Sequence, residues 1–210
     1  MNREKLIKNW LIPALIAIAV FAVFNPSLKG EFLNWDDLGN TVENLKYRAG
    51  WGEVIKWSFT SFYREHFMPV SWIIFAGIYK IWGLYPFGYH LISLIFHITT
   101  AIALYFLALK LIKSKLGSLF AALFFALQPL RVEAVSWVSA WAYPICGFFS
   151  ILTILSLSQI YRIKKNPTWR SHRQMAGSRS LLVFFDISIF SLSLTLKIHR
   201  NQFTGSFIYT

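Results

Sequence analysis

Long apolar runs separated by short basic segments constrain the fold of this chain more than any other feature. A helix needs about 20 largely apolar residues to cross the hydrocarbon core of a bilayer. Charged residues make up only 14% of the chain, whereas soluble domains average about 25%. The sequence therefore predicts an all-α, polytopic membrane protein with about five spans. The expected spans are Trp10–Phe24, Tyr89–Leu109, Leu116–Leu127, Val138–Ile160 and Leu181–Leu196.

The basic segments between the apolar runs predict the orientation of the chain. Lys and Arg cluster in residues 3–8, 110–115, 162–165 and 170–173, beside the apolar runs. The positive-inside rule places such segments in the cytoplasm. This condition is met if the short apolar run Pro69–Trp82 lies flat or re-entrant instead of crossing. We therefore expect a cytoplasmic N-terminus. Because Lys and Arg cluster beside the apolar runs, the net charge of +12 does not make nucleic acid an expected partner.

In this arrangement residues 25–88 form an extracytoplasmic loop. The stretch Trp51–Phe59 places Trp51, Val54, Ile55 and Phe59 near one face of a helix. A short helix with such an apolar face is typical of a segment lying in the membrane interface. The loop is therefore expected to carry interfacial amphipathic helices.

The same topology brings ionisable residues together on the extracytoplasmic side. Ionisable groups beside a bilayer are costly to hold, so they are candidates for function. A sugar carried on a lipid phosphate needs such a surface, because an acid can accept the proton of an acceptor hydroxyl and cations can hold the departing phosphate. The residues concerned are Asp36, Asp37, His66, His90, Arg131 and Glu133.

Each of these residues also has a purely structural interpretation. Asp36-Asp37 could begin a turn or cap a short helix. Arg131 and Glu133 could form an interfacial ion pair that contributes little energy. His90 and His97 lie seven residues apart and so share one helix face, too far apart to bind one metal. We expect His97 to pack against a neighbouring helix and His90, at the outer end, to be the better functional candidate.

Several short motifs, in order, resemble the bacterial relatives of the transmembrane and tetratricopeptide-repeat O-mannosyltransferases, a family of the GT-C class of membrane glycosyltransferases. The resemblance covers roughly Met1 to Tyr161, and its motifs are fairly specific only as a set. The matching stretches are Phe32–Asp37, Trp51–Val54 with Phe59-Thr60, Met68–Trp72, Gly83–Leu91 with His97, and Ala126–Trp137.

The resemblance implies roles for the ionisable residues. It places a general-base or acceptor-positioning role on Asp36 or Asp37, and a second acidic role on Glu133. The expected contacts to the donor phosphate are Arg131, His90 and His66. The implied partners are a polyprenyl-phosphate sugar donor, a protein Ser/Thr acceptor and the lipid bilayer, in a bacterial inner membrane. A divalent metal is possible, but no ligand set is evident.

The chain also departs from the family pattern. Gln128 and Met68 occupy positions where many relatives carry His or another basic residue, and residues 140–144 replace a charged stretch. We expect residues 1–196 to be a partial GT-C-like transmembrane domain and residues 197–210 an aberrant or disordered tail of a truncated product without repeats. Two functions stay open: a glycosyltransferase or a fragment of one, and a non-catalytic membrane module or partner subunit.

Overall fold

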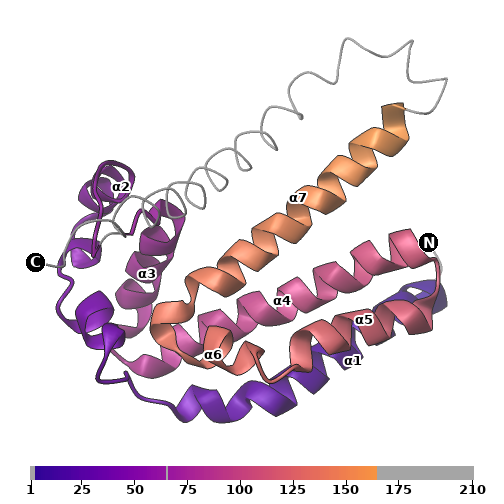
Figure 1. Cartoon of the computed structure of the whole chain (residues 1–210), viewed down its shortest axis with the longest axis horizontal. Coiled ribbons are helices and arrows are strands. Elements are labelled where there is room, and N and C mark those ends of the chain that lie inside the picture. The colour runs from indigo at the N-terminus through magenta and orange to yellow at the C-terminus, as the bar shows by residue number, and fades with distance from the viewer. Residues whose placement is uncertain (1–2, 65, 165–210) are drawn as a thin grey trace, which may run out of the picture.

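The computed structural model describes residues 3–64 and 66–164, and these residues form helices joined by short loops (Figure 1). The three longest helices are α1 (Arg3–Phe24), α4 (Pro86–Ile112) and α7 (Ala142–Lys164). The shorter α-helices are α2 (Trp51–Thr60), α3 (Pro69–Trp82), α5 (Lys115–Leu127) and α6 (Arg131–Ser136). Single turns of tighter or wider helix are η1 (Asn25–Lys29), η2 (Leu38–Val42), η3 (Lys46–Arg48) and η4 (Val138–Ala140). The all-α fold class is confirmed.

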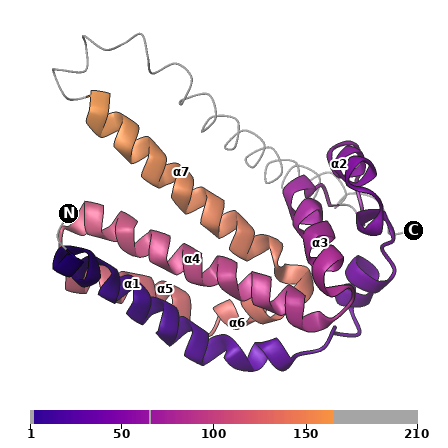
Figure 2. The ribbon, with the colours of Figure 1, turned by 180° about the vertical axis from the view of Figure 1, so that it is seen from behind.

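Helix α4 is the centre of a bundle that α1, α5 and α7 complete (Figure 2). Helices α1, α4 and α5 meet around a buried cluster, here called the bundle core. Small residues such as Ala101, Ala122 and Ala126 let the helices approach closely, which is typical of packing within membranes. The other buried members of the bundle core are Ile16, Val20, Phe24, Leu94, Tyr105 and Val135.

In the described residues, three helical segments are long and apolar enough to cross a membrane: Trp10–Lys29, Pro86–Ile112 and Val138–Ser158. They correspond to three of the spans expected from the sequence. The expected span Leu116–Leu127 is helical as α5 but has 13 residues, a length of about 20 Å, which is too short to cross alone. The expected span Leu181–Leu196 and the tail 197–210 lie outside the described residues.

The outer surfaces of the bundle helices are apolar. On α5, Leu116, Phe120 and Phe124 follow one another at helical spacing and are 63%, 65% and 77% exposed. Exposure of such an apolar stripe to water is unfavourable, whereas lipid tails solvate it. The exposed stripe therefore agrees with a helix bundle embedded in a membrane.

Helix α3 has 14 residues, a length shorter than a span needs, and whether it crosses stays a prediction. It ends at Gly83, whose φ of +60° suits a residue without Cβ. In Figures 1 and 2, α3 turns away from α4 and carries α2 on its outer side. Helices α2, α3 and η3 thus form a cap on the bundle.

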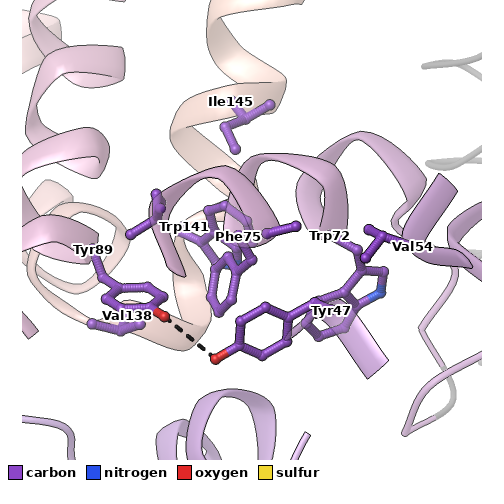
Figure 3. Packing of buried hydrophobic residues seen from close by; sticks show 10 residues of the cluster. Tyr47, Val54, Trp72, Phe75, Tyr89, Val138, Trp141 and Ile145 are labelled. Atoms are coloured by element: carbon purple, nitrogen blue, oxygen red, sulfur yellow. Dashed lines mark hydrogen bonds between the residues drawn. The ribbon is translucent and has the colours of Figure 1, made fainter. Parts of the chain in front are cut away.

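A second buried cluster, here called the aromatic cap core, joins this cap to α4 and α7 (Figure 3). The rings of Phe75 and Trp141 are in direct contact, with centroids 3.6 Å apart. The hydroxyls of Tyr47 and Tyr89 are 3.3 Å apart and share a hydrogen bond. The other buried members are Val54, Trp72, Ala76, Ile78, Val138 and Ile145.

The expected apolar face of α2 is divided by this packing. Val54 is fully buried in the aromatic cap core, whereas Trp51, Ile55 and Phe59 are 47%, 46% and 43% exposed. Val54 therefore does not belong to a membrane-facing stripe, and only the other three residues present an apolar face outward. Tertiary packing buries Val54, and Trp51, Ile55 and Phe59 remain able to contact a membrane interface.

The loops that carry the candidate site residues lie at one end of the bundle (Figure 1). Helices α1 and α5 end there, and α4 and α7 begin there. Residues 25–86 and 128–141 are consequently neighbours, as the expected topology requires. The side of the membrane that this end occupies stays a prediction.

Candidate functional site

A pocket of about 500 Å³ opens at the loop end of the bundle, and we call it the loop-end pocket. Its wall comes from three separate parts of the chain: residues 27–35 after α1, His90 of α4, and residues 132–137 around α6. The backbone makes this possible because η1 packs on α4 and α6 packs on both α1 and α4. Two carboxylates, Glu31 and Glu133, line the pocket, and the described residues contribute no Lys or Arg to its lining.

The two adjacent acids Asp36 and Asp37 have different environments. Asp37 is fully buried. Its Oδ1 accepts hydrogen bonds from the Ser139 backbone N–H at 2.7 Å and the Ser139 hydroxyl at 2.6 Å. Its Oδ2 accepts one from the Leu33 N–H at 3.0 Å. These bonds tie the first loop to the segment after α6, so Asp37 holds the two walls of the loop-end pocket together.

Asp37 does not act as a helix cap. It precedes η2, but its side chain makes no capping bond to that turn. The capping interpretation of the acidic pair is therefore wrong for this residue. Its carboxylate instead bonds the Leu33 N–H, which precedes it, and Ser139, which lies 102 positions away.

Asp36, in contrast, is accessible, with 49% of its side chain exposed. It lines a polar groove together with Asn40, Arg64 and His66. The Arg64 guanidinium lies 3.9 Å from Asp36 and 3.9 Å from Glu43. A Cβ on Gly39 would lie 2.1 Å from the Arg64 guanidinium carbon, so this glycine leaves the space that the guanidinium occupies.

Among the described residues, Arg131 and Glu133 form no ion pair with each other. The ion-pair interpretation of these two residues is therefore wrong. The Arg131 guanidinium lies over the Phe125 ring, 4.4 Å from its centroid, and its Nε donates to the Phe125 carbonyl at 3.3 Å. Gln128 Oε1 accepts from the same guanidinium at 3.0 Å once its amide is oriented to match. Arg131 thus braces the α5–α6 turn and is absent from the lining of the loop-end pocket, whereas Glu133 is exposed within it.

The two histidines of α4 also differ. Both are 2% exposed. His97 Nε2 bonds the Ala126 carbonyl of α5 at 3.0 Å, which confirms the expected packing role. His90 lines the loop-end pocket, and neither of its ring nitrogens has a hydrogen-bond partner of normal geometry, although the Gly30–Glu31 backbone lies beside the ring.

The predicted site residues therefore divide among three places. Glu133 and His90 meet in the loop-end pocket, Asp36 and His66 meet in the polar groove, and Arg131 and Asp37 brace the loops between them. In the described part of the chain, no group of three or more His, Cys, Asp or Glu side chains is placed to hold a metal ion.

Sequence reasoning missed several residues at this end. Glu31, Lys29 and Arg64 were not predicted, although each belongs to the charged first loop. Trp35 and Trp137 were not predicted as site residues either, but both line the loop-end pocket, with ring centroids 6.3 Å apart. For Glu31, Lys29 and Arg64, the concentration of acidic and basic residues in the first loop was the signal that could have found them. The pairing of the two tryptophans, about a hundred residues apart, had no local signal.

Comparison with known proteins points in one direction. The chain is 27% identical to human protein O-mannosyl-transferase TMTC1 over 158 residues, which is 70% of this chain and 18% of that protein. It is 30% identical to mouse protein O-mannosyl-transferase TMTC3 over 98 residues, which is 46% of this chain and 10% of that protein. Mouse TMTC1 is 28% identical over 156 residues, covering 68% of this chain and 16% of the relative.

These similarities support a distant relationship to protein O-mannosyl-transferases. The chain spans less than a fifth of the length of the curated relatives it matches. No family model matches the chain, and no solved structure matches it.

Proposed function

We propose that this chain is a membrane glycosyltransferase, or part of one, that moves a sugar from a polyprenyl-phosphate donor to a Ser or Thr hydroxyl of a protein. One observation carries the proposal: carboxylates, imidazoles and a guanidinium from distant segments line two hollows at the loop end of an apolar helix bundle. The distant relationship to protein O-mannosyl-transferases supports the same reaction class.

In the proposed reaction, the bond between the anomeric carbon and the phosphate oxygen breaks, and a bond from that carbon to the acceptor oxygen forms. The acceptor proton passes to a carboxylate, and polyprenyl phosphate leaves. Asp36 is the acid of the pair that can accept this proton, because half of its side chain is exposed while Asp37 is fully buried.

The cation for the departing phosphate is Arg64 in this proposal. Its guanidinium faces the polar groove beside Asp36 and His66, and a planar guanidinium can bond two phosphate oxygens at once. Arg131, the residue expected from the sequence, is already engaged with Phe125 and Gln128. The loop end of the bundle would face the extracytoplasmic side, where the acceptor is presented.

A transfer assay tests the proposal. The full chain is reconstituted in liposomes with radiolabelled mannosyl-phosphopolyprenol and a Ser/Thr-rich peptide. We expect label in the peptide, and a loss of about 100-fold or more for Asp36→Asn, as for other general bases. Glu53→Gln, a change on the exposed surface of α2 away from both hollows, is the matched control and should keep full activity.

Unchanged transfer in Asp36→Asn would remove that residue from the reaction. Absence of transfer together with absence of donor binding would overturn the transferase function. The alternative, a non-catalytic membrane module, would then be the function to propose.

A further inference from the structure

We propose that the loop-end pocket binds an acyl chain of a zwitterionic aminophospholipid, whose ammonium group meets the carboxylates of Glu31 and Glu133 at the rim of the pocket. This lipid comes from the surrounding leaflet and is distinct from the proposed sugar donor, so its binding does not depend on the transferase function. Three features of the pocket support the assignment: its depth in the bundle, its apolar surface and the charge at its rim.

The first feature is the depth of the pocket in the bundle. Each of the three described segments that are long enough to cross a membrane has an end at this pocket (Figure 1). Ser27 and His90 line it from within about one helical turn of the ends of two of these segments, and Trp137 directly precedes the third. One turn of helix rises about 5 Å. The pocket is therefore level with the boundary between the hydrocarbon core and the headgroups.

The second feature is the inner surface of the pocket, which is almost wholly apolar. Leu33, Trp35 and Val132 line it and are themselves 53%, 79% and 53% exposed. Contact between such side chains and water is unfavourable, whereas a hydrocarbon chain covers them without that cost. The volume of about 500 Å³ is in the usual range for a site that takes a small apolar ligand.

Exposed apolar residues also lie on the elements that lead to the pocket. Val23, in the last turn of α1, is 52% exposed, and Leu130, between α5 and α6, is 81% exposed. These side chains contact lipid when the bundle is embedded, so hydrocarbon chains are the apolar molecules closest at hand. This setting favours a lipid chain as the occupant over an apolar side chain of a soluble peptide.

The third feature is the charge at the rim. Glu31 and Glu133 are exposed and line the pocket, yet its inner surface is apolar, so their carboxylates lie at its edge. The described residues contribute no Lys or Arg to the lining. Two carboxylates repel an anionic headgroup and attract an ammonium group, which can donate charge-assisted hydrogen bonds to them.

This charge selects among the lipids of a leaflet. A phospholipid with an ethanolamine headgroup carries no net charge and supplies the ammonium group, whereas one with a glycerol headgroup is anionic. The same repulsion disfavours the phosphate of a polyprenyl-phosphate donor at this rim. The lipid site is therefore separate from the polar groove that contains Arg64.

Photo-crosslinking in lipid nanodiscs tests the inference. Two probes carry the same diazirine-labelled acyl chain, one on phosphatidylethanolamine and the other on phosphatidylglycerol. The full chain is irradiated with each probe, and the labelled peptides are mapped by mass spectrometry. Labelling of α5, whose exposed stripe contacts lipid tails of any kind, is the internal reference. We expect the ratio of labelling in residues 27–35 and 132–137 to labelling in α5 to be about fivefold higher for the ethanolamine probe, the upper range for an exposed ion pair.

Variants separate the headgroup from the chain. In the double variant Glu31→Gln with Glu133→Gln, the two probes should label the pocket equally, because both rim charges are lost. Trp35→Ala should lower pocket labelling by both probes, because it removes apolar surface that the chain covers. Glu53→Gln, which removes an exposed carboxylate of α2 outside the pocket, is the matched control and should keep the ethanolamine preference. All four positions are exposed, so their replacement spares the folded core.

The other outcomes would overturn the site. Equal pocket ratios for the two probes, or a higher ratio for the glycerol probe, would show ordinary contact with the bilayer. Displacement of the ethanolamine probe by polyprenyl phosphate, where excess unlabelled phosphatidylethanolamine should displace it, would assign the pocket to the sugar donor. Labelling of α5 without labelling of the pocket would leave the pocket to an occupant other than lipid. None of these results depends on sugar transfer, so each leaves the transferase proposal to its own assay.

Discussion

The two buried clusters of this chain are built from different residues, although α4 contributes to both. The bundle core holds small and aliphatic residues such as Ala101, Ala122 and Ile16, whereas the aromatic cap core holds Trp72 and Phe75. Lipid solvates apolar side chains as well as a neighbouring helix does, so helices within it associate through close packing. The cap emerges from the bundle and relies on large aromatic surfaces and on buried hydroxyl bonds.

This difference explains where the hollows form. Close-packed helices leave little space between them, while irregular loops braced on aromatic residues leave gaps at their edges. The loop-end pocket lies on the bundle side of that boundary, and Asp37 and Ser139 connect its two walls. We therefore expect changes in the aromatic cap core to loosen the loops and to leave the packing of the bundle helices unchanged.

The largest expected effect is that of Phe75→Ala. Phe75 is fully buried and contacts Trp141, Tyr89 and Tyr47 through ring packing. Loss of a buried phenylalanine costs about 3–5 kcal/mol, and we expect the loss to appear in the cap. Hydrogen exchange in nanodiscs should show faster exchange in residues 38–82 with little change in α1 and α5.

Leu94→Ala is the matched change in the bundle core, where Leu94 is 1% exposed. It should cost about 2–5 kcal/mol and raise exchange along α1, α4 and α5 instead. Equal loosening of both regions by either variant would contradict the division of the chain into two clusters.

A smaller effect is expected for Asp37→Asn. The amide would place a donor against the Ser139 or Leu33 N–H, so one of the three bonds to the carboxylate becomes a repulsive contact. The loss of charged hydrogen bonds costs about 1.5–3 kcal/mol. Exchange of the Ser139 and Leu33 amide protons should rise most.

Asp36→Asn is the matched control for stability, because this neighbour is half exposed and its ion pair with Arg64 is long. Its effect should stay within about 0.5 kcal/mol. If the two variants were equally destabilising, the different roles of the adjacent acids would be refuted.

The fold was largely predictable because it depends on local patterns. The apolar runs marked α1, α4, α5 and α7, and the short apolar run with Lys80 marked α3. The gathering of the site residues at one end followed from counting spans. Periodicity and length are properties of neighbouring residues, so they survive in a single sequence.

The candidate site was less predictable because it depends on distant partners. Asp36 and Asp37 are adjacent, yet Asp37 is buried and bonds Ser139, which is distant in the sequence, whereas Asp36 is half exposed. Arg131 binds Phe125 instead of facing the pocket, and Trp137 meets Trp35 across the fold. Neither spacing nor charge pattern specifies which segments become neighbours, so these roles needed the tertiary structure.

The smallest effect expected for a change at a buried residue concerns the hydroxyl bonds of the aromatic cap core. The Tyr47 hydroxyl donates to the Thr41 carbonyl at 2.8 Å, and Arg48 donates to the same carbonyl at 2.6 Å. Because Arg48 would still satisfy the carbonyl, Tyr47→Phe should cost only about 1 kcal/mol near neutral pH. Thermal unfolding of the reconstituted chain measures this loss.

The same variant should change how stability depends on pH. Burial is the main cause that raises the pKa of the Tyr47 hydroxyl above its ordinary value of 10.0, while hydrogen bonds with Tyr89 and Arg48 lower it. The folded state therefore keeps this proton where the unfolded state has lost it. The contribution is fully present below pH 10 and is lost as the pH rises through the raised value.

Tyr47→Phe should lose less stability between pH 9 and pH 11 than the unaltered chain, whereas Tyr85→Phe, at an exposed tyrosine, should follow the unaltered chain. Parallel curves for Tyr47→Phe and the unaltered chain would show that this hydroxyl contributes nothing to the alkaline stability of the cap.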